Sequence, residues 1–110
     1  MRTELSGYRI MWMMVMFDLP VVTSKERKAA GVFRKHLQNL GFEMAQFSIY
    51  YRVMGSKEVA KRYLKQIEGK VPKDGSVNIL TVTDKQYENM VCFTGREKNR
   101  PPEVLQLSLF

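Results

Sequence analysis

The chain has 110 residues, of which 45% are hydrophobic and 26% are charged. This length suits one compact domain with a modest core and is too short for two, and a homodimer would add the buried surface that one small chain lacks. Eighteen Lys and Arg residues against eleven Asp and Glu residues leave a net charge of +7. That balance either marks a polyanionic partner or merely keeps a basic surface soluble.

No segment has the length of a membrane span. A secretion signal stays open as the minor alternative, because Arg2 and Arg9 precede the apolar run, although Glu4 dilutes their positive charge. The apolar run at 10–17 is shorter than the ~20 residues that a transmembrane helix needs. Asp18 and Pro20 follow this run without a small-residue cleavage site. Cys92 is the only cysteine, which excludes an intrachain disulfide, and no His or Cys stands near it at the spacing of zinc ligands. We therefore expect a cytoplasmic protein that does not associate with a membrane.

The first predicted element is a strand, IMWMMVMF, at residues 10–17. Its length and the turn residues behind it favour a strand covered on both faces, hence central in its sheet, over a short buried helix. Thr23 and Glu26 then have the spacing of a capping box. A helix should follow and end at Gly41 in a left-handed cap. Its apolar positions recur at helical spacing: Ala29, Ala30, Phe33, Leu37 and Leu40.

Residues 42–54 are rich in aromatic and β-branched side chains. They predict either one long strand or two strands with a tight bend near Gln46. Ser56 can cap a second helix that Gly69 would end. Beyond it, SVNILTVT at 76–83 has the pattern of a strand, and YENMVCF at 87–93 has that of a fifth.

This order of elements predicts an α+β fold. It matches the ferredoxin-like β-α-β-β-α-β sandwich, with extra C-terminal strand material, in which both helices cover one face of an antiparallel sheet. We expect this domain to span residues 1–98, because no repeat, linker or low-complexity segment interrupts it. The other face of the sheet must then meet something else.

The sequence NRPP at 99–102 separates a short tail, residues 99–110, from the predicted domain. The tail alternates leucines with other residues, which is the periodicity of a strand. It either folds back onto its own sheet or docks on another chain, such as a dimer mate or a larger protein. The residues assigned to this contact are Leu105, Leu107, Leu109 and Phe110.

Basic residues gather in the two predicted helices. Residues 25–35 carry five basic side chains against one acid, and residues 52–73 carry seven against two. These cations lie in stripes away from the apolar faces, with few acids between them. We predict that they bind the phosphates of a nucleic acid duplex by shape and charge, because no base-reading motif accompanies them. The residues assigned to this contact are Lys25, Arg27, Lys28, Arg34, Lys35 and Arg52.

Asp18 stands at the end of the first predicted strand. Period-two alternation places it on the same side as Trp12, Met14 and Met16. It either caps the turn toward the first helix or contributes to a Mg²⁺ site, since Mg²⁺ commonly uses one or two carboxylates together with waters and substrate phosphates. One Asp per chain would become two across a dimer axis.

The segment FDLPVVTSKERKAAGVFRKHLQNLGFEMAQFSIYYRV at 17–53 combines three features. An aromatic-Asp pair ends the first strand, a basic helix ends in Leu-Gly-Phe, and Gln46-x-Ser48-Ile49-Tyr50 follows. With these features the chain resembles the CRISPR-associated Cas2 family, the small subunit of the spacer-acquisition complex. DLP followed by Thr, Arg-Lys and Phe-Arg-Lys resembles the form found beside Cas9-type systems.

The resemblance implies a ferredoxin-like homodimer in which the two copies of Asp18 face each other and C-terminal strands complete the sheets. It also implies assembly with a larger integrase subunit around a duplex DNA prespacer on the basic surface. Members of the family are described as Mg²⁺-dependent endonucleases on RNA or duplex DNA, and Asp18 would then be the catalytic residue and the metal ligand. Phe17 stands where the family commonly has Tyr.

Three functions therefore stay open. The first is a DNA-holding subunit of the spacer-integration machinery, the second a stand-alone metal-dependent endoribonuclease or duplex DNA endonuclease, and the third a toxin-type ribonuclease of the VapD-like fold. Against hydrolysis, no second acid lies close to Asp18 in the sequence, and the only histidine, His36, lies in a predicted helix. The match through Gln46 to Tyr50 and the long tail favour the Cas2 resemblance over the toxin.

Overall fold

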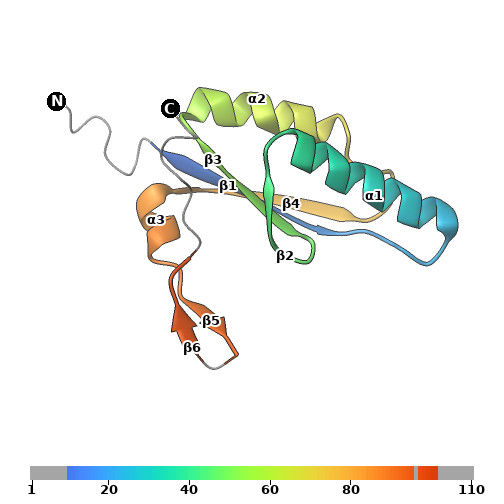
Figure 1. Cartoon of the computed structure of the whole chain (residues 1–110). Helices are drawn as coiled ribbons and strands as arrows, with labels where there is room; N and C mark the ends of the chain where they lie inside the picture. The colour runs from blue at the N-terminus through green and yellow to red at the C-terminus, as the bar shows by residue number, and fades with distance from the viewer. Residues whose placement is uncertain (1–9, 96, 102–110) are drawn as a thin grey trace.

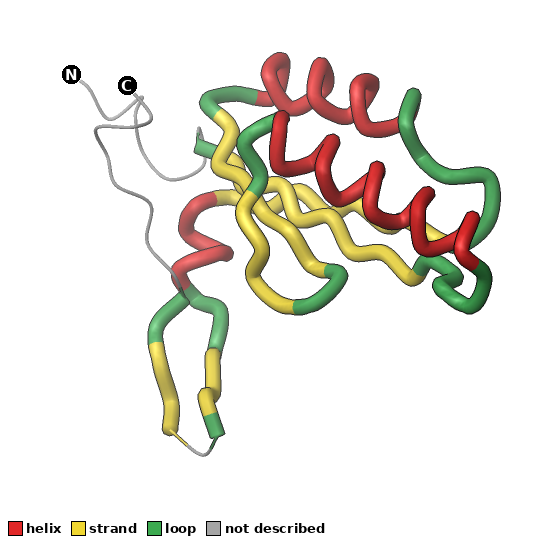
Figure 2. Tube along the Cα trace, turned by 45° about the vertical axis from the view of Figure 1, so that its right-hand side comes forward, coloured by secondary structure: helices red, strands yellow, loops and turns green. Residues whose placement is uncertain are grey.

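A computed structural model describes residues 10–95 and 97–101 of the chain (Figure 1). A four-stranded antiparallel sheet has the strand order β2-β3-β1-β4. Two helices lie over one face of this sheet (Figure 2). The elements are β1 (Met11–Asp18), α1 (Ser24–Asn39), β2 (Glu43–Gln46), β3 (Ile49–Met54), α2 (Lys57–Glu68) and β4 (Ser76–Thr83). Their order and pairing confirm the predicted ferredoxin-like β-α-β-β-α-β arrangement, with β1 as a central strand.

Helix α1 begins and ends where its cap residues predict. The Thr23 hydroxyl accepts a hydrogen bond from the Glu26 N–H at 3.1 Å, and the Glu26 carboxylate accepts one from the Thr23 N–H at 2.9 Å. This is the predicted capping box, which satisfies donors that a helix start otherwise leaves unpaired. Beyond the last turn, Gly41 adopts a φ of 91°, which is the left-handed conformation expected of it.

The aromatic segment at 42–54 forms two strands, which settles the choice between one strand and a bent pair. Phe47 and Ser48 make the turn between β2 and β3, and Ser48 adopts a φ of 64°. The Phe17 N–H donates to the Ser48 carbonyl at 3.0 Å. This bond fixes the hairpin turn beside the end of β1.

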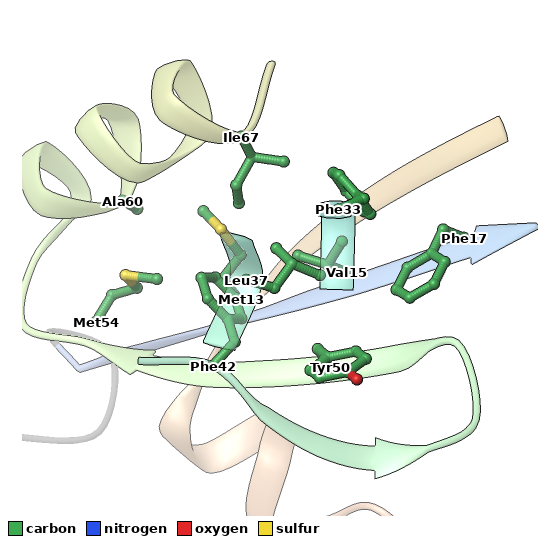
Figure 3. Close-up of a cluster of buried hydrophobic side chains, with 10 residues drawn as sticks. All are labelled: Met13, Val15, Phe17, Phe33, Leu37, Phe42, Tyr50, Met54, Ala60 and Ile67. Atoms are coloured by element: carbon green, nitrogen blue, oxygen red, sulfur yellow. The ribbon is translucent and has the colours of Figure 1, made fainter. Parts of the chain in front are cut away.

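The main core lies between the sheet and the two helices (Figure 3). Its closest ring pair is Phe17 on β1 and Phe33 on α1, which meet edge to face with centroids 5.3 Å apart. Such aromatic pairs add to the free energy gained from burying their apolar area. The buried members of this core are Met13, Val15, Phe17, Phe33, Leu37, Phe42, Tyr50, Met54, Ala60 and Ile67.

The predicted fifth strand at 87–93 is wrong over most of its length. Residues Asp84–Glu88 form a short helix, α3, and only Cys92–Thr94 form a strand, β5. The reason is a second capping box, in which the Thr83 hydroxyl accepts from the Gln86 N–H and the Gln86 side chain accepts from the Thr83 N–H. Strand β5 pairs with β6 (Glu97–Asn99) in a separate two-stranded sheet.

Helix α3 covers part of the sheet face that α1 and α2 leave open. There Tyr87 packs with Trp12, Tyr51 and Val53 in a second buried cluster. Burial raises the pKa of the Tyr87 phenol above its ordinary value, and the nearby Tyr51 adds to this.

The predicted tail contacts at Leu105, Leu107, Leu109 and Phe110 lie outside the described residues and stay predictions. The predicted domain boundary between residues 98 and 99 falls within β6. In the part of the chain that the structure describes, no helix is both long enough and apolar enough to span a membrane.

Candidate nucleic-acid interface and metal-binding carboxylate

Asp18 is the last residue of β1 and lies exposed at the edge of the open sheet face. Val15 and Phe17 point into the core under the helices, whereas Trp12 and Met14 belong to the cluster on the other side. Strand alternation therefore places Asp18 on the side of Trp12 and Met14, as predicted, and the structure shows that this is the face opposite the helices. Among residues 10–95 and 97–101, no hydrogen bond or ion pair engages its carboxylate.

The backbone around Asp18 is held closely by the start of β4, where Asp18 pairs with Ser76. The preceding residue, Gly75, has a φ of 100°. A Cβ atom at this position would lie 2.7 Å from the Asp18 carbonyl oxygen and 2.8 Å from a methyl carbon of Leu19. Only glycine fits both this conformation and this space.

We expect Gly75→Ala to lower the free energy of unfolding by more than about 1 kcal/mol, because the new methyl group is strained by φ and by the Asp18 backbone. Gly31→Ala is the matched control, since a Cβ atom on Gly31 in α1 meets nothing within 4 Å. That change should raise stability by up to about 1 kcal/mol through helix propensity. Urea unfolding of both variants measures the difference, and two effects of the same sign would contradict this account of Gly75.

The basic side chains of α1 that were assigned to phosphate binding differ in what they contact. Lys25, Lys28 and Lys35 are exposed along the helix. Arg27 turns back, and its Nη1 donates to the carbonyls of Val21 and Val22 at 3.2 and 2.7 Å, so it braces the loop between β1 and α1. These three lysines are therefore the α1 side chains best placed to meet a phosphate from outside.

Arg34 connects α1 to the strand that carries Asp18. Its guanidinium carbon lies 5.7 Å from the centroid of the Phe17 ring, and the side chain is half-buried. A cation placed over a ring face is attracted to it and loses part of its freedom to move. The structure thus brings Arg34 near the end of β1, beside the residue that precedes Asp18.

Arg52 lies apart from Lys25 and Lys28. Its guanidinium carbon is 4.4 Å from the centroid of the Tyr63 ring on α2, and Nη1 donates to the Val53 carbonyl at 2.9 Å. Its Nε atom lies beside Gly41, just past the C-terminal end of α1. The start of α1 is about 20 Å away along the helix axis at the usual rise per residue. Arg52 therefore joins β3 to α2 in this structure.

Helix α2 contributes exposed cations that the sequence-based assignment left out. They stand on α2, which covers the same face of the sheet as α1 (Figure 2). The four-residue spacing of Lys57, Lys61 and Lys65, which places side chains on one helix face, was the available signal. These residues are Lys57, Lys61, Arg62 and Lys65.

Asp18 suits Mg²⁺ as a single carboxylate ligand. Mg²⁺ in proteins often takes one or two carboxylates and completes its octahedron with waters and phosphate oxygens. Within the described residues, no group of three or more His, Cys, Asp or Glu side chains is placed to hold a metal ion. The described part of one chain thus brings no complete set of protein ligands to Asp18, and the remaining positions would fall to water, substrate or a second copy.

Comparison with known proteins agrees with this fold. Residues 11–90 match the family model described as CRISPR associated protein Cas2. Three relatives named "CRISPR-associated endoribonuclease Cas2" are similar over most of their length. The protein of Paracidovorax avenae is 50% identical over 94 residues, which cover 86% of this chain and 87% of the relative. The protein of Flavobacterium psychrophilum is 44% identical over 108 residues, covering 96% and 94%.

The third relative, from Acidovorax ebreus, is 38% identical over 102 residues, which cover 91% of this chain and all of the relative. The family model, these identities and the observed strand order agree with the resemblance drawn from the segment at 17–53. The chain therefore belongs to the CRISPR-associated Cas2 family.

Proposed function

We propose that this protein is a dimeric, nucleic-acid-holding subunit of the cytoplasmic machinery that captures and integrates new spacers into a CRISPR array. In that machinery it works with the larger integrase subunit. The observation that carries the proposal is the helix layer, that is, α1 and α2 on one face of the sheet, because both helices carry exposed lysines. Such a surface suits the backbone of a duplex DNA prespacer, or of RNA, more than it suits any particular base sequence.

The open sheet face supports the dimer in this proposal. Strand pairing places Met14, Met16, Ile49 and Leu80 on it, and Leu80 is 51% exposed. An apolar sheet face of this kind gains free energy when a second copy covers it. With Asp18 on the same face, two copies would bring two carboxylates toward one axis, where they repel each other unless a cation lies between them.

A second candidate function is Mg²⁺-dependent cleavage of RNA or duplex DNA. Two observations favour it: the relatives carry the name endoribonuclease, and Asp18 is exposed with its carboxylate unengaged. When bound, Mg²⁺ would neutralise phosphate charge and make a bound water more acidic. Asp18 would hold the ion, and the substrate phosphate would reach it from the open sheet face.

We expect Lys28→Gln to reduce the salt dependence of duplex binding. Each lysine that truly contacts a phosphate releases counterions, so removing it should lower the slope of log K against log salt by about one. Lys85→Gln is the matched control, because Lys85 is an exposed lysine on α3, outside the helix layer. Anisotropy titrations with one labelled duplex measure both slopes. Equal slopes for the two variants would place the phosphate contact elsewhere.

We propose that the tail docks on the integrase subunit through Leu105, Leu107, Leu109 and Phe110. Removing residues 103–110 should then abolish co-purification of the two proteins while duplex binding by the truncated chain persists. The physical reason is that alternate leucines of an added strand fill pockets of its partner. Co-purification at the full-length level after truncation would remove the tail from the contact.

A further inference from the structure

Trp12 makes two separate contacts with α3. Its ring is stacked on the Tyr87 ring, with centroids 3.8 Å apart and an interplanar angle of 6°. Its indole N–H donates to an Asp84 carboxylate oxygen at 2.6 Å, across 72 residues of sequence. Tyr51 on β3 lies against the same indole with a centroid distance of 5.7 Å. Trp12 in the sheet thus contacts α3 both through the face of its indole ring and through its indole N–H.

The chain entering α3 is tied to the same end of the sheet. The Asp84 N–H donates to the Ile10 carbonyl at 2.9 Å, and the Thr83 capping box starts the helix directly after β4. Asp84 therefore pairs with the start of β1 through its backbone and with Trp12 through its side chain. These contacts determine both the position and the rotation of a helix only five residues long.

The β5–β6 hairpin follows α3 and projects away from the main sheet (Figures 1 and 2). Within the described residues its two strands pair with each other and with no strand of the main sheet. Phe93, in β5, is 64% exposed, and Val91, just before it, is 59% exposed. Among the described residues, α3 is the element that joins this hairpin to the main sheet.

We infer that Trp12 and Asp84 form a clamp that fixes α3 on the sheet and thereby sets the direction in which the β5–β6 hairpin projects. Both are positioning residues. They determine where the exposed apolar side chains of the hairpin are presented. That this surface serves assembly rests on the proposed function, but the clamp itself forms within one chain.

Breaking the hydrogen bond should be enough to release the hairpin. Without the Asp84 oxygen, the indole N–H is left buried and unpaired, which is unfavourable until α3 shifts and water reaches it. A five-residue helix has too few internal hydrogen bonds to keep its place alone. The hairpin would then sample many directions instead of one.

The distance between the sheet and the hairpin can be measured by energy transfer from Trp12, because the chain contains one Trp and one Cys. Trp12 is then the single donor, and one introduced Cys can carry the acceptor dye. In a Cys92→Ser, Lys98→Cys background, an acceptor dye on the exposed residue 98 of β6 receives energy from Trp12. Time-resolved donor fluorescence then gives the distribution of distances between sheet and hairpin. With the clamp intact, we expect one narrow distribution.

Asp84→Ala in this background should broaden the distribution and change the mean transfer efficiency. Asp84→Asn keeps an oxygen acceptor without the charge and should retain the narrow distribution, as should Glu88→Ala, which removes an exposed acid from the other end of α3. Tyr87→Leu, which removes the ring stacked on Trp12 and keeps an apolar side chain in the cluster, repeats the test if Asp84→Ala folds poorly. A narrow, unshifted distribution in Asp84→Ala or Tyr87→Leu would overturn the clamp.

Labelled chains are then diluted with unlabelled protein. Energy transfer within one chain is unaffected by this dilution, whereas energy transfer between two copies falls. Sedimentation of the same variants reports the dimer independently. A wild-type protein that stays monomeric would contradict the proposed dimer while leaving the clamp result standing. A dimer with the same stability in Asp84→Ala as in Glu88→Ala would show that hairpin direction does not serve assembly.

Discussion

Replacing Asp18 with alanine should abolish any Mg²⁺-dependent cleavage of RNA or duplex DNA and leave duplex binding intact. The carboxylate is the one exposed oxygen ligand at the end of β1, on the face opposite the α1 and α2 lysines. Loss of a metal ligand removes several kcal/mol of charge stabilisation, so the rate should fall by about 100-fold or more. Binding should persist because it depends on the helix layer.

The matched control for this experiment is Asp74→Ala. Asp74 is another exposed acid, in the turn directly before Gly75, and therefore lies near the same end of the sheet. Wild type and both variants would be purified by one scheme and assayed for cleavage and binding in the same samples. Cleavage retained in Asp18→Ala would defeat the assignment of Asp18 as metal ligand. If neither the wild type nor either variant cleaves and all three bind the duplex equally, the protein binds nucleic acid without hydrolysing it.

Replacing Phe33 with alanine should cost about 3–5 kcal/mol of unfolding free energy, the usual range for removing a buried aromatic ring. Phe33 is 1% exposed and packs edge to face on Phe17. The cavity would open directly beneath the end of β1. Since the unfolding free energy of a small domain is only about 5–15 kcal/mol, this single change would remove a large part of the stability.

Val32→Ala controls for the effect of a substitution on α1 itself. Val32 is the neighbouring residue and is 58% exposed, so its replacement should change stability by no more than about 0.5 kcal/mol. Urea unfolding followed by far-ultraviolet circular dichroism measures both variants. Equal losses at the two positions would contradict the described core.

Much of the fold could be predicted because local and tertiary signals agree between residues 10 and 83. Thr23 with Glu26 marks one helix start and Ser56 marks the other, and both act as caps in the structure. The apolar run before Asp18 is long enough to indicate a central strand, and β1 is central. Alternation along that strand then placed Asp18 on the open face without any further information.

The residues after Thr83 were predicted wrongly because their composition indicates a strand whereas their capping residues indicate a helix. YENMVCF is rich in strand-forming residues, yet Thr83 and Gln86 form the same kind of capping box as Thr23 and Glu26. The contact that settles the conflict is Tyr87 stacked on Trp12, which lies far away in the sequence. A pairing of that range has no local signature, so propensity alone favoured the wrong element.

The cations show a second limit of sequence reasoning. Spacing places Arg27 and Arg52 among basic residues, but it does not reveal what a long side chain contacts. Arg27 folds back onto the loop carbonyls of Val21 and Val22, and Arg52 stacks on Tyr63. The exposed lysines, by contrast, lie where helix periodicity puts them, because nothing in the described structure draws them inward.

The central claim is that the helix layer holds nucleic acid. Hydrogen exchange of the full-length protein, with and without a saturating DNA duplex, tests it most directly. We expect slower exchange in the first turns of α1, at the loop between β1 and α1, and along α2 near Lys61 and Lys65. The β5–β6 hairpin should exchange as before. Protection confined to the open sheet face or the hairpin, with α1 and α2 unchanged, would contradict the account.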